Sequence, residues 1–334
     1  MRSCLVTGGC GFIGSNLTHR LVREGWRVDV VDDMSNGHLE LLEGLKMRVI
    51  PGETLLSEFE KVEASARDDK TVLVIESDFA AAGVLNRIAE SRYDVIFHQA
   101  AIPRVSYSVE NPSETTDINI SRTVKMFEAA RENVSRIVWA SSSSVYGGAE
   151  TLPTSETLPK FPKSPYAWQK SAIEDVARLF GDLYDLDIVC LRYFNVFGPG
   201  QYGDSPYSTA VSSWCNNTKF SKPLRSDGDG TQSRDMCYVE NTVEANVLAA
   251  NSNMRFMGKA YNVACGDRTT NGEILEYFKK RFPYAVVQTA PWRPGDVMHT
   301  QADISEIQKD LGYEPKVRFW EGLEKTLDWW DIDG

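Results

Sequence analysis

The sequence predicts an α/β protein built on a doubly wound parallel sheet. Over the first 190 residues, short apolar segments alternate with longer segments of helical periodicity. The apolar segments contain few polar residues, as expected of strands that helices cover on both faces. The chain also begins with a strand, a glycine-rich loop, a helix and a second strand within residues 3–32. That order is typical of the unit from which doubly wound sheets are assembled.

The individual elements follow from the same alternation, because apolar runs predict strands and apolar residues spaced three or four apart predict helices. Strands are expected at residues 3–7, 27–31, 47–50, 71–76, 94–97, 134–140 and 187–192. Helices are expected from the glycine loop to residue 25 and at residues 36–45, 52–70, 79–91, 112–132 and 166–184. Beyond Arg192, proline, glycine and short polar segments become denser, which predicts a second, smaller region.

The glycine-rich loop has the pattern of a dinucleotide site. Gly8, Gly11 and Gly14 lie between the first strand and the first helix. Glycines there allow a tight turn and a close approach of backbone N–H groups to a pyrophosphate, which the helix dipole also attracts. Asp32 ends the second strand, 18 residues after Gly14, where a carboxylate accepts hydrogen bonds from an adenosine ribose. A carboxylate repels a 2′-phosphate, so the pattern predicts NAD rather than NADP.

A second pattern predicts acid–base chemistry. Tyr166 and Lys170 are four residues apart in an expected helix, and therefore on one face of it. An ammonium group close to a phenol stabilises the phenolate, so we expect a lowered pKa for Tyr166 and a usable general acid or base. The expected strand before this helix ends in the hydroxyl-rich segment 141–144. Together these groups predict proton transfer at an alcohol carbon.

Composition and charge exclude several classes of function. The 334-residue chain has a net charge of −11 and a pI of about 5.0, which argue against a nucleic-acid partner. No apolar run is long enough to span a bilayer and the N-terminus has no signal-peptide layout, so we expect a cytoplasmic protein without a membrane partner. Six singly scattered cysteines and four histidines without ligand spacing predict no disulfide scaffold and no metal. His98 is expected to be a hydrogen-bonded core histidine.

Further motifs complete a resemblance to a known family. They are His98-Gln99-Ala100-Ala101, Arg192-Tyr193-Phe194-Asn195-Val196-Phe197-Gly198-Pro199, Asp229-Gly230-Thr231-Gln232-Ser233-Arg234-Asp235 and Arg293-Pro294-Gly295-Asp296-Val297. With them, nearly the whole chain resembles the extended short-chain dehydrogenase/reductase family and, within it, the nucleotide-sugar 4-epimerases. The resemblance implies a Rossmann-type doubly wound parallel sheet with a smaller mixed α/β substrate-binding domain. We expect the NAD-binding domain at residues 1–190 plus about 233–257, and the nucleotide-sugar-binding domain at about 191–232 plus 258–334.

The resemblance also implies which residues bind the NAD cofactor. The pyrophosphate would lie on Gly8, Gly11, Phe12, Ile13 and Gly14, and the adenosine ribose beside Asp32, Asp33, Ser35, Asn36 and Gly37. The adenine would lie beside Asp78 and Phe79, and the nicotinamide ribose beside Ala100, Ala101, Asn119, Tyr166 and Lys170, with Phe194 near the nicotinamide.

For the substrate, the resemblance implies a nucleotide sugar held by its diphosphate. Asn195, Arg234 and Arg293 would hold the diphosphate, and Asp296 the nucleoside ribose. Arginine forks suit this role because they match phosphate oxygens in two-point contacts. Ser142 and Ser143 would lie at the sugar 4-hydroxyl. The implied reaction removes the 4-hydroxyl proton through Tyr166, passes through a transient 4-keto sugar and returns hydride to the opposite face.

Three features bear on which sugar is used. The serine segment carries no Asp-Glu pair, which 4,6-dehydratases need. Thr300 is small where a large residue narrows the pocket of relatives, which favours UDP-N-acetylglucosamine and UDP-N-acetylgalactosamine, with UDP-glucose and UDP-galactose as further substrates. Arg104 would suit a 6-carboxylate, which keeps a UDP-glucuronate 4-epimerase or decarboxylase as an alternative. The polar segment Leu224-Arg225-Ser226-Asp227 offers little to a uracil ring.

Two further expectations concern function class and assembly. A non-catalytic NAD-binding regulator is the alternative from another class, although both Tyr166 and Lys170 are present. The helices expected at residues 112–132 and 166–184 pair into a four-helix dimer interface in relatives, so a homodimer is expected.

Overall fold

The computed structural model describes residues 1–51, 70–90, 92–148, 150–203, 209–292 and 297–332. The helix expected at 52–70 therefore lies almost wholly outside the described residues. The chain divides into two compact units. Unit 1 comprises Met1–Ser142, Pro162–Leu191 and Val243–Ala260, and unit 2 comprises Ser143–Phe161, Arg192–Thr242 and Tyr261–Gly334. Relative to the expected division, residues 143–161 and 233–242 fall in the second unit instead of the first, and residues 191 and 258–260 fall in the first instead of the second.

The predicted doubly wound sheet is present, with eight strands in the order β12-β7-β6-β5-β1-β2-β4-β3. The registers that join β3, β4, β2, β1, β5 and β6 are all parallel. The strands are β1 (Ser3–Thr7), β2 (Arg27–Asp32), β3 (Met47–Pro51), β4 (Val72–Glu76), β5 (Val95–His98), β6 (Arg136–Ser142), β7 (Ile188–Tyr193) and β12 (Ala260–Val263). Because β1 lies between β5 and β2, the chain order reverses beside β1, where doubly wound sheets bind their ligands.

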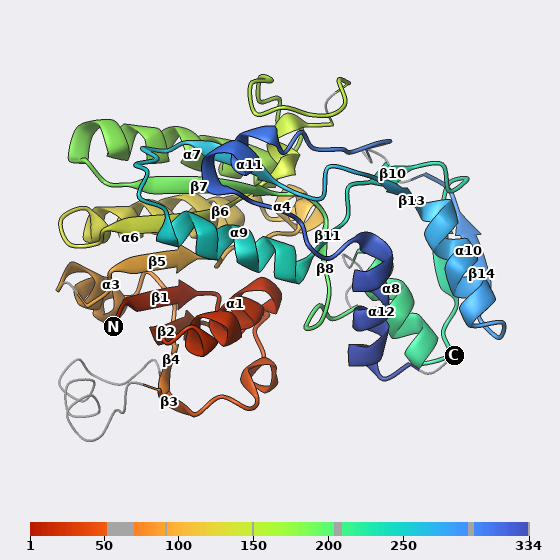
Figure 1. Cartoon of the computed structure of the whole chain (residues 1–334), viewed down its shortest axis with the longest axis horizontal. Coiled ribbons are helices and arrows are strands. Elements are labelled where there is room, and N and C mark those ends of the chain that lie inside the picture. The colour runs from red at the N-terminus through yellow and green to blue at the C-terminus, as the bar shows by residue number, and fades with distance from the viewer. Residues whose placement is uncertain (52–69, 91, 149, 204–208, 293–296, 333–334) are drawn as a thin grey trace. The chain divides into compact units, whose positions relative to one another are not determined.

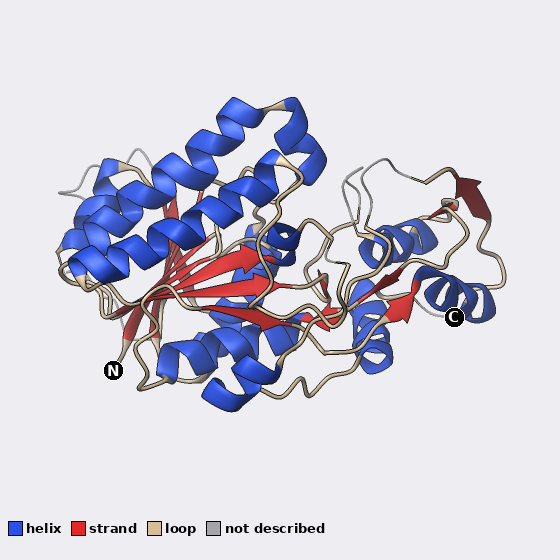
Figure 2. Ribbon diagram, turned by 90° about the horizontal axis from the view of Figure 1, so that it is seen from above, coloured by secondary structure: helices blue, strands red, loops and turns tan. Residues whose placement is uncertain are grey.

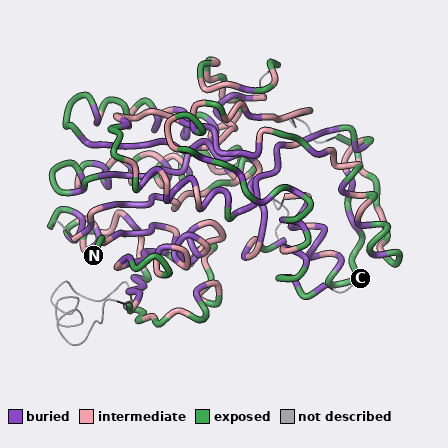
Figure 3. Tube along the Cα trace, in the orientation of Figure 1, coloured by how far each residue is buried: buried purple, intermediate pink, exposed green. Residues whose placement is uncertain are grey.

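Helices cover both faces of this sheet (Figure 2). The helices are α1 (Phe12–Arg23), α3 (Ala82–Ala89), α4 (Val105–Glu110), α5 (Pro112–Thr116), α6 (Thr123–Ala130), α7 (Pro165–Tyr184) and α9 (Val239–Asn251). Figure 1 shows α1 and α9 in front of the sheet, and α3, α6 and α7 lie behind it. The second group packs with Ile96, Ile137 and other strand residues into one core cluster. Figure 3 shows that the buried stretches of unit 1 run along the strands of the sheet.

Two helices differ from those expected. The segment expected as a helix at 36–45 forms only a short 3₁₀ helix, Leu39–Leu42. The long helix expected at 112–132 is divided into α5, a π-helical turn at Asp117–Arg122 and α6. The unexpected helix α4 ends directly before α5, because Asn111 precedes a proline and adopts φ −128° and ψ 60°, outside the helical region.

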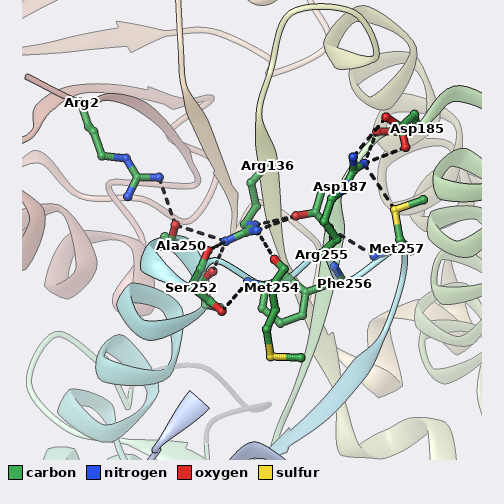
Figure 4. Close-up of polar contacts among 11 residues, drawn as sticks. Arg2, Arg136, Asp185, Asp187, Ala250, Ser252, Met254, Arg255, Phe256 and Met257 are labelled. Atoms are coloured by element: carbon green, nitrogen blue, oxygen red, sulfur yellow. Dashed lines mark hydrogen bonds and ion pairs between the residues drawn. The ribbon is translucent and has the colours of Figure 1, made fainter. Parts of the chain in front are cut away.

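A buried arginine ties the amino ends of β6 and β7 to the end of α9 (Figure 4). The Arg136 guanidinium donates to Asp187 Oδ2 from Nε at 2.8 Å and from Nη2 at 2.7 Å. It also donates to the carbonyl oxygens of Ala249, in the last turn of α9, and of Ser252, just after that helix, at 2.8 and 2.7 Å. Its Cζ lies 4.7 Å from the centroid of the Phe256 ring. Arg136 thus satisfies one of the carbonyls in the last turn of α9, and Arg2 donates to another, that of Ala250, at 3.0 Å.

Unit 2 is a smaller mixed α/β structure. Its strands form three two-stranded pairs, of which β8 with β11 and β9 with β14 are parallel, and β10 with β13 is antiparallel. The strands are β8 (Val196–Phe197), β9 (Leu224–Asp227), β10 (Ser233–Arg234), β11 (Cys237–Tyr238), β13 (Thr269–Thr270) and β14 (Val287–Ala290). The helices are α8 (Ala210–Lys219), α10 (Asn271–Arg281), α11 (Ser305–Leu311) and α12 (Phe319–Trp330). Among the described residues, no helix is both long and apolar enough to cross a bilayer.

Candidate active site

The loop between β1 and α1 has the geometry that a pyrophosphate requires. A Cβ on Gly14 would lie 2.0 Å from the carbonyl oxygen of Gly8, and a Cβ on Gly8 would lie 2.9 Å from Ala100 Cα. Only glycine fits at these two positions, and Gly8 also has a φ of +67°. Gly11 caps the N-terminus of α1 without a side-chain hydrogen bond, so the first N–H groups of the helix face outward for an anion.

The segment after β2 is folded around Asp32. The buried carboxylate accepts hydrogen bonds from the backbone N–H of Cys10 at 2.9 Å and of Met34 at 3.0 Å. Gly37 lies so close that a Cβ there would be 2.5 Å from Asp32 Oδ1. Burial raises the pKa of Asp32. Each carboxylate oxygen still has a lone pair for a ribose hydroxyl, so the contacts fit the expected role.

Asp78 and Phe79, which follow β4, are both fixed by contacts with other residues of unit 1. Asp78 accepts from the backbone N–H of Ala80 at 2.6 Å and forms an ion pair with Arg122. Phe79 is buried, with its ring centroid 4.8 Å from that of His98. His98 is itself buried between the Thr7 hydroxyl at 2.6 Å and the Thr123 hydroxyl at 3.0 Å. The expectation of a hydrogen-bonded core histidine is therefore confirmed, and burial lowers the pKa of His98 to about 3.

Helix α7 places Tyr166 and Lys170 together at the end of β6. It begins with the Ser164 hydroxyl accepting from the backbone N–H of Ala167, followed by Pro165 at the first position, which is a strong helix start. Both side chains are more than nine-tenths buried. Lys170 Nζ donates to the carbonyl oxygen of Ala140 at 2.6 Å and lies 5.8 Å from the centroid of the Tyr166 ring.

The electrostatics of this pair differ from those expected. Burial raises the pKa of Tyr166 to about 12, and a hydrogen bond with Ser142 offsets part of that rise. Burial also lowers the pKa of Lys170 to about 7. The direction of the Tyr166 shift is therefore opposite to the lowering expected from Lys170, because desolvation of the buried phenol outweighs the hydrogen bond with Ser142.

Replacing Lys170 with methionine should change how stability depends on pH. The pKa of Lys170 is about 7 in the folded chain and 10.5 ordinarily, so unfolding takes up a proton between those values and stability rises with pH there. The difference in unfolding free energy, wild type minus variant, should rise by about 1.4 kcal/mol per pH unit between pH 7 and 9. Urea denaturation of the cofactor-stripped proteins at both pH values measures it, and equal pH dependence would contradict it.

Two positioning contacts escaped the sequence reasoning. The Asn119 amide donates to Gln169 Oε1 at 2.8 Å and accepts from the backbone N–H of Ile102 at 2.9 Å, which fixes the segment after Ala100 and Ala101. Ser141 Oγ donates to the buried Glu174 at 2.6 Å. Glu174 follows Lys170 by four residues, so the spacing that paired Tyr166 with Lys170 could have found it. No such signal points to Gln169.

In unit 2 the structure brings Asn195 and Thr300 into contact with each other and with the backbone of Asp235, the residue after Arg234. Asn195, at φ +29°, donates to Thr300 Oγ1 at 3.1 Å and to the carbonyl oxygen of Asp235 at 3.2 Å. Arg234 Nη1 donates to the carbonyl oxygens of Ser233 and Met298 at 3.0 and 3.1 Å. Arg293 and Asp296 lie outside the described residues.

Asp235 organises this group, a role that the motif alone did not predict. Its fully buried carboxylate accepts from the backbone N–H groups of Cys265, Gly266 and Ala302 at 2.9, 3.0 and 3.0 Å. Burial raises its pKa to about 7. Three chain segments of unit 2 are therefore joined at one side chain directly after Arg234.

The remaining predicted site residues divide between the units. Ser142 ends β6 in unit 1, whereas Ser143 begins the adjoining 3₁₀ turn in unit 2. Phe194 is buried in unit 2 in a core cluster with Tyr146. Arg104 lies in unit 1, where its Nη2 donates to Asn36 Oδ1 at 2.6 Å.

Comparison with known proteins identifies the family. The model of the NAD-dependent epimerase/dehydratase family matches residues 4–264. The chain belongs to this family. It is 32% identical to a UDP-glucose 4-epimerase of Mycolicibacterium smegmatis over 97% of both chains. NAD is therefore its cofactor, in agreement with the glycine cradle and Asp32.

Solved structures of the epimerase/dehydratase family support the same assignment. One is a UDP-N-acetylglucosamine 4-epimerase from Methanobrevibacter ruminantium in complex with UDP-N-acetylmuramic acid, with a TM-score of 0.85 and 31% identity over 99% of this chain and 98% of that one. Another is a UDP-glucuronic acid 4-epimerase from Bacillus cereus in complex with UDP-glucuronic acid and NAD, with a TM-score of 0.81 and 28% identity over 98% and 99%. These relatives share a reaction and differ in the sugar.

Proposed function

We propose that this chain is a UDP-sugar 4-epimerase, an isomerase that interconverts UDP-N-acetylglucosamine and UDP-N-acetylgalactosamine and also accepts UDP-glucose and UDP-galactose. The main support for this type of reaction is the buried pair Tyr166 and Lys170, which lies beside Ser142 at the carboxyl end of β6. The pair belongs to unit 1, which also contains the glycine-rich loop. Relatives that span the same length as this chain are named 4-epimerases of UDP-sugars.

The proposed roles follow from the chemistry of the side chains. Bound NAD supplies the acceptor for the hydride on C4 and the source from which it returns. Tyr166 takes the proton of the 4-hydroxyl and gives it back to the epimeric oxygen, while Ser142 hydrogen-bonds to that oxygen. The raised pKa of Tyr166 keeps it a neutral phenol, and a positive charge bound nearby, such as that of oxidised nicotinamide, would favour the phenolate. Asn195 and Arg234 hold the diphosphate together with Arg293, and Asp296 holds the nucleoside ribose.

Thr300 supports the choice of a 2-acetamido sugar. Its side chain is small, and its hydroxyl positions Asn195 and accepts from the backbone N–H of Asp235 at 3.1 Å. Replacing Thr300 with tyrosine should lower kcat/KM for UDP-N-acetylglucosamine at least about tenfold more than for UDP-glucose, because the added bulk excludes the acetyl group. Thr300→Val is the matched control, because it removes the same hydroxyl at nearly constant size. The valine substitution should change kcat/KM by the same factor for both substrates. A loss of kcat/KM confined to UDP-N-acetylglucosamine in the valine variant would contradict the argument from size.

A product assay tests the proposed substrate directly. Purified protein would be incubated with UDP-N-acetylglucosamine, UDP-glucose or UDP-glucuronate, and the products separated by chromatography. Formation of the 4-epimer from the first sugar supports the proposal. Turnover of UDP-glucuronate alone, with or without release of carbon dioxide, would overturn it in favour of the uronic-acid alternative. Unchanged sugars in every arm would favour a non-catalytic NAD-binding regulator.

We also propose that the protein is a homodimer. Helix α7 carries Trp168, Leu179 and Leu183 with 51, 46 and 69% of their surface exposed, and the neighbouring α4 exposes Val105 and Val109. Apolar side chains gathered on adjacent helices favour a protein partner. Sedimentation equilibrium would test the proposal, and a monomer at micromolar concentration would contradict it.

A further inference from the structure

The strand order places three loops side by side at one edge of the sheet. The strands β5, β1 and β2 are neighbours and run parallel, so their carboxyl ends meet at this edge. The glycine loop follows β1, residues 33–38 follow β2 and residues 99–104 follow β5. The glycine loop, with its helix N-terminus for the pyrophosphate, therefore lies between the other two.

One hydrogen bond joins the two outer loops. Arg104 Nη2 donates to Asn36 Oδ1 at 2.6 Å, between residues that are 68 positions apart in sequence. Because these residues belong to the loops that flank the glycine loop, the bond crosses the carboxyl end of β1. A dinucleotide on the glycine loop would lie at this same end of β1.

Both ends of the bond are attached to fixed backbone. On one side, the Asn119 amide binds the backbone N–H and carbonyl of Ile102 at 2.9 and 3.2 Å, two residues before Arg104. On the other side, Gly37 packs on the Asp32 carboxylate and the backbone N–H of His38 donates to the carbonyl oxygen of Cys10 at 2.8 Å. The bond can therefore open by rotation of the exposed Asn36 side chain and the half-buried Arg104 side chain without any movement of the loops.

We propose that Arg104 and Asn36 form a strap across the carboxyl end of β1 that slows release of the cofactor from the glycine loop. Arg104 is then a positioning residue for NAD, and not the residue that recognises a sugar carboxylate. The inference rests on the proposed function, because an epimerase must return the hydride it has taken and so must keep the reduced cofactor until the turnover ends. A strap that holds the cofactor serves this requirement without contacting the sugar.

The test is the rate at which the NAD-loaded protein releases its cofactor. Wild type, Arg104→Met, Asn36→Ala and the double variant would be loaded with labelled NAD and chased with excess unlabelled NAD. Each single variant should release NAD about tenfold faster, as expected for the loss of one hydrogen bond to a charged group. When Asn36 is already alanine, adding Arg104→Met should raise the rate of NAD release less than twofold, because the hydrogen-bond partner of Arg104 is already absent. Tyr107→Phe, on the same helix α4, is the matched control and should release NAD at the wild-type rate.

Three outcomes would overturn the strap. The first is release of NAD from both single variants at the wild-type rate. The second is a double variant whose release rate is raised by the product of the two single-variant factors, because independent effects mean that the two side chains do not act through one bond. An Arg104→Met variant with normal release but a loss of kcat/KM confined to UDP-glucuronate would assign Arg104 to the sugar carboxylate. Faster release in a protein that turns over none of the UDP-sugars would support the strap while contradicting the proposed function, so the two failures are distinguishable.

Discussion

Replacing Tyr166 with phenylalanine should abolish turnover while leaving the fold and the bound cofactor in place. The substitution removes only the phenolic oxygen, which lies buried and hydrogen-bonded to Ser142 at the end of β6. Loss of a positioned general acid–base group costs about 10²- to 10⁴-fold in rate. The measurement is kcat for UDP-N-acetylglucosamine, together with the amount of NAD that copurifies with the variant.

A second tyrosine provides the control for that loss. The Tyr107 hydroxyl donates to Glu114 at 2.8 Å on the surface of unit 1. Tyr107→Phe should therefore keep kcat within about twofold of wild type, as surface substitutions away from a site usually do. A Tyr166→Phe enzyme with comparable activity would remove Tyr166 from the mechanism, and loss of NAD from that variant would show a structural role instead.

The largest loss of stability is expected from replacing Arg136 with methionine. The buried guanidinium neutralises Asp187 and binds the carbonyl groups of Ala249, in the last turn of α9, and Ser252, just after it. Asp187 also accepts from the backbone N–H of Phe256 at 2.6 Å. Removing one partner of a buried ion pair leaves an uncompensated charge and costs about 3–5 kcal/mol of unfolding free energy. Urea denaturation of the NAD-loaded protein measures this cost.

Figure 4 also contains the matched control for this prediction. Arg255 forms an ion pair with Asp185 at 2.9 Å, but its side chain is half exposed. Pairs of that kind contribute about 0–1 kcal/mol, so Arg255→Met should unfold at nearly the wild-type urea concentration. Equal losses of unfolding free energy in the two variants would mean that the burial of Arg136 does not determine how much it contributes to stability.

The sheet could be predicted from the sequence because its signals are local. Each apolar run lies within one strand, and Gly8, Gly11 and Gly14 lie within one short stretch between β1 and the first turn of α1. Both patterns can therefore be recognised without knowing any contact between distant residues. The π-helical turn that carries Asn119 was missed because helical periodicity continues through it, and the short helix α4 before Pro112 was not predicted. The transfer of residues 143–161 to unit 2 depends on contacts distant in sequence, such as Tyr146 with Asn262 at 2.7 Å.

The candidate site shows the same division between local and distant information. Spacing placed Tyr166 and Lys170 on one helix face correctly, but it does not encode burial, and burial determines the direction of both pKa shifts. The bond between Arg104 and Asn36 joins loops that follow different strands, and the three amide contacts of Asp235 join segments 30 to 67 residues away. Sequence spacing alone cannot reveal such pairs.

The central claim is that this chain epimerises a UDP-sugar at C4 with a hydride that never leaves the enzyme. The most direct measurement is proton NMR of UDP-N-acetylglucosamine incubated with the purified protein in deuterium oxide, without added NAD. The account predicts that UDP-N-acetylgalactosamine appears and that C4 of both sugars keeps its proton. Deuterium at C4, or the absence of any epimer when NAD is also supplied, would contradict it.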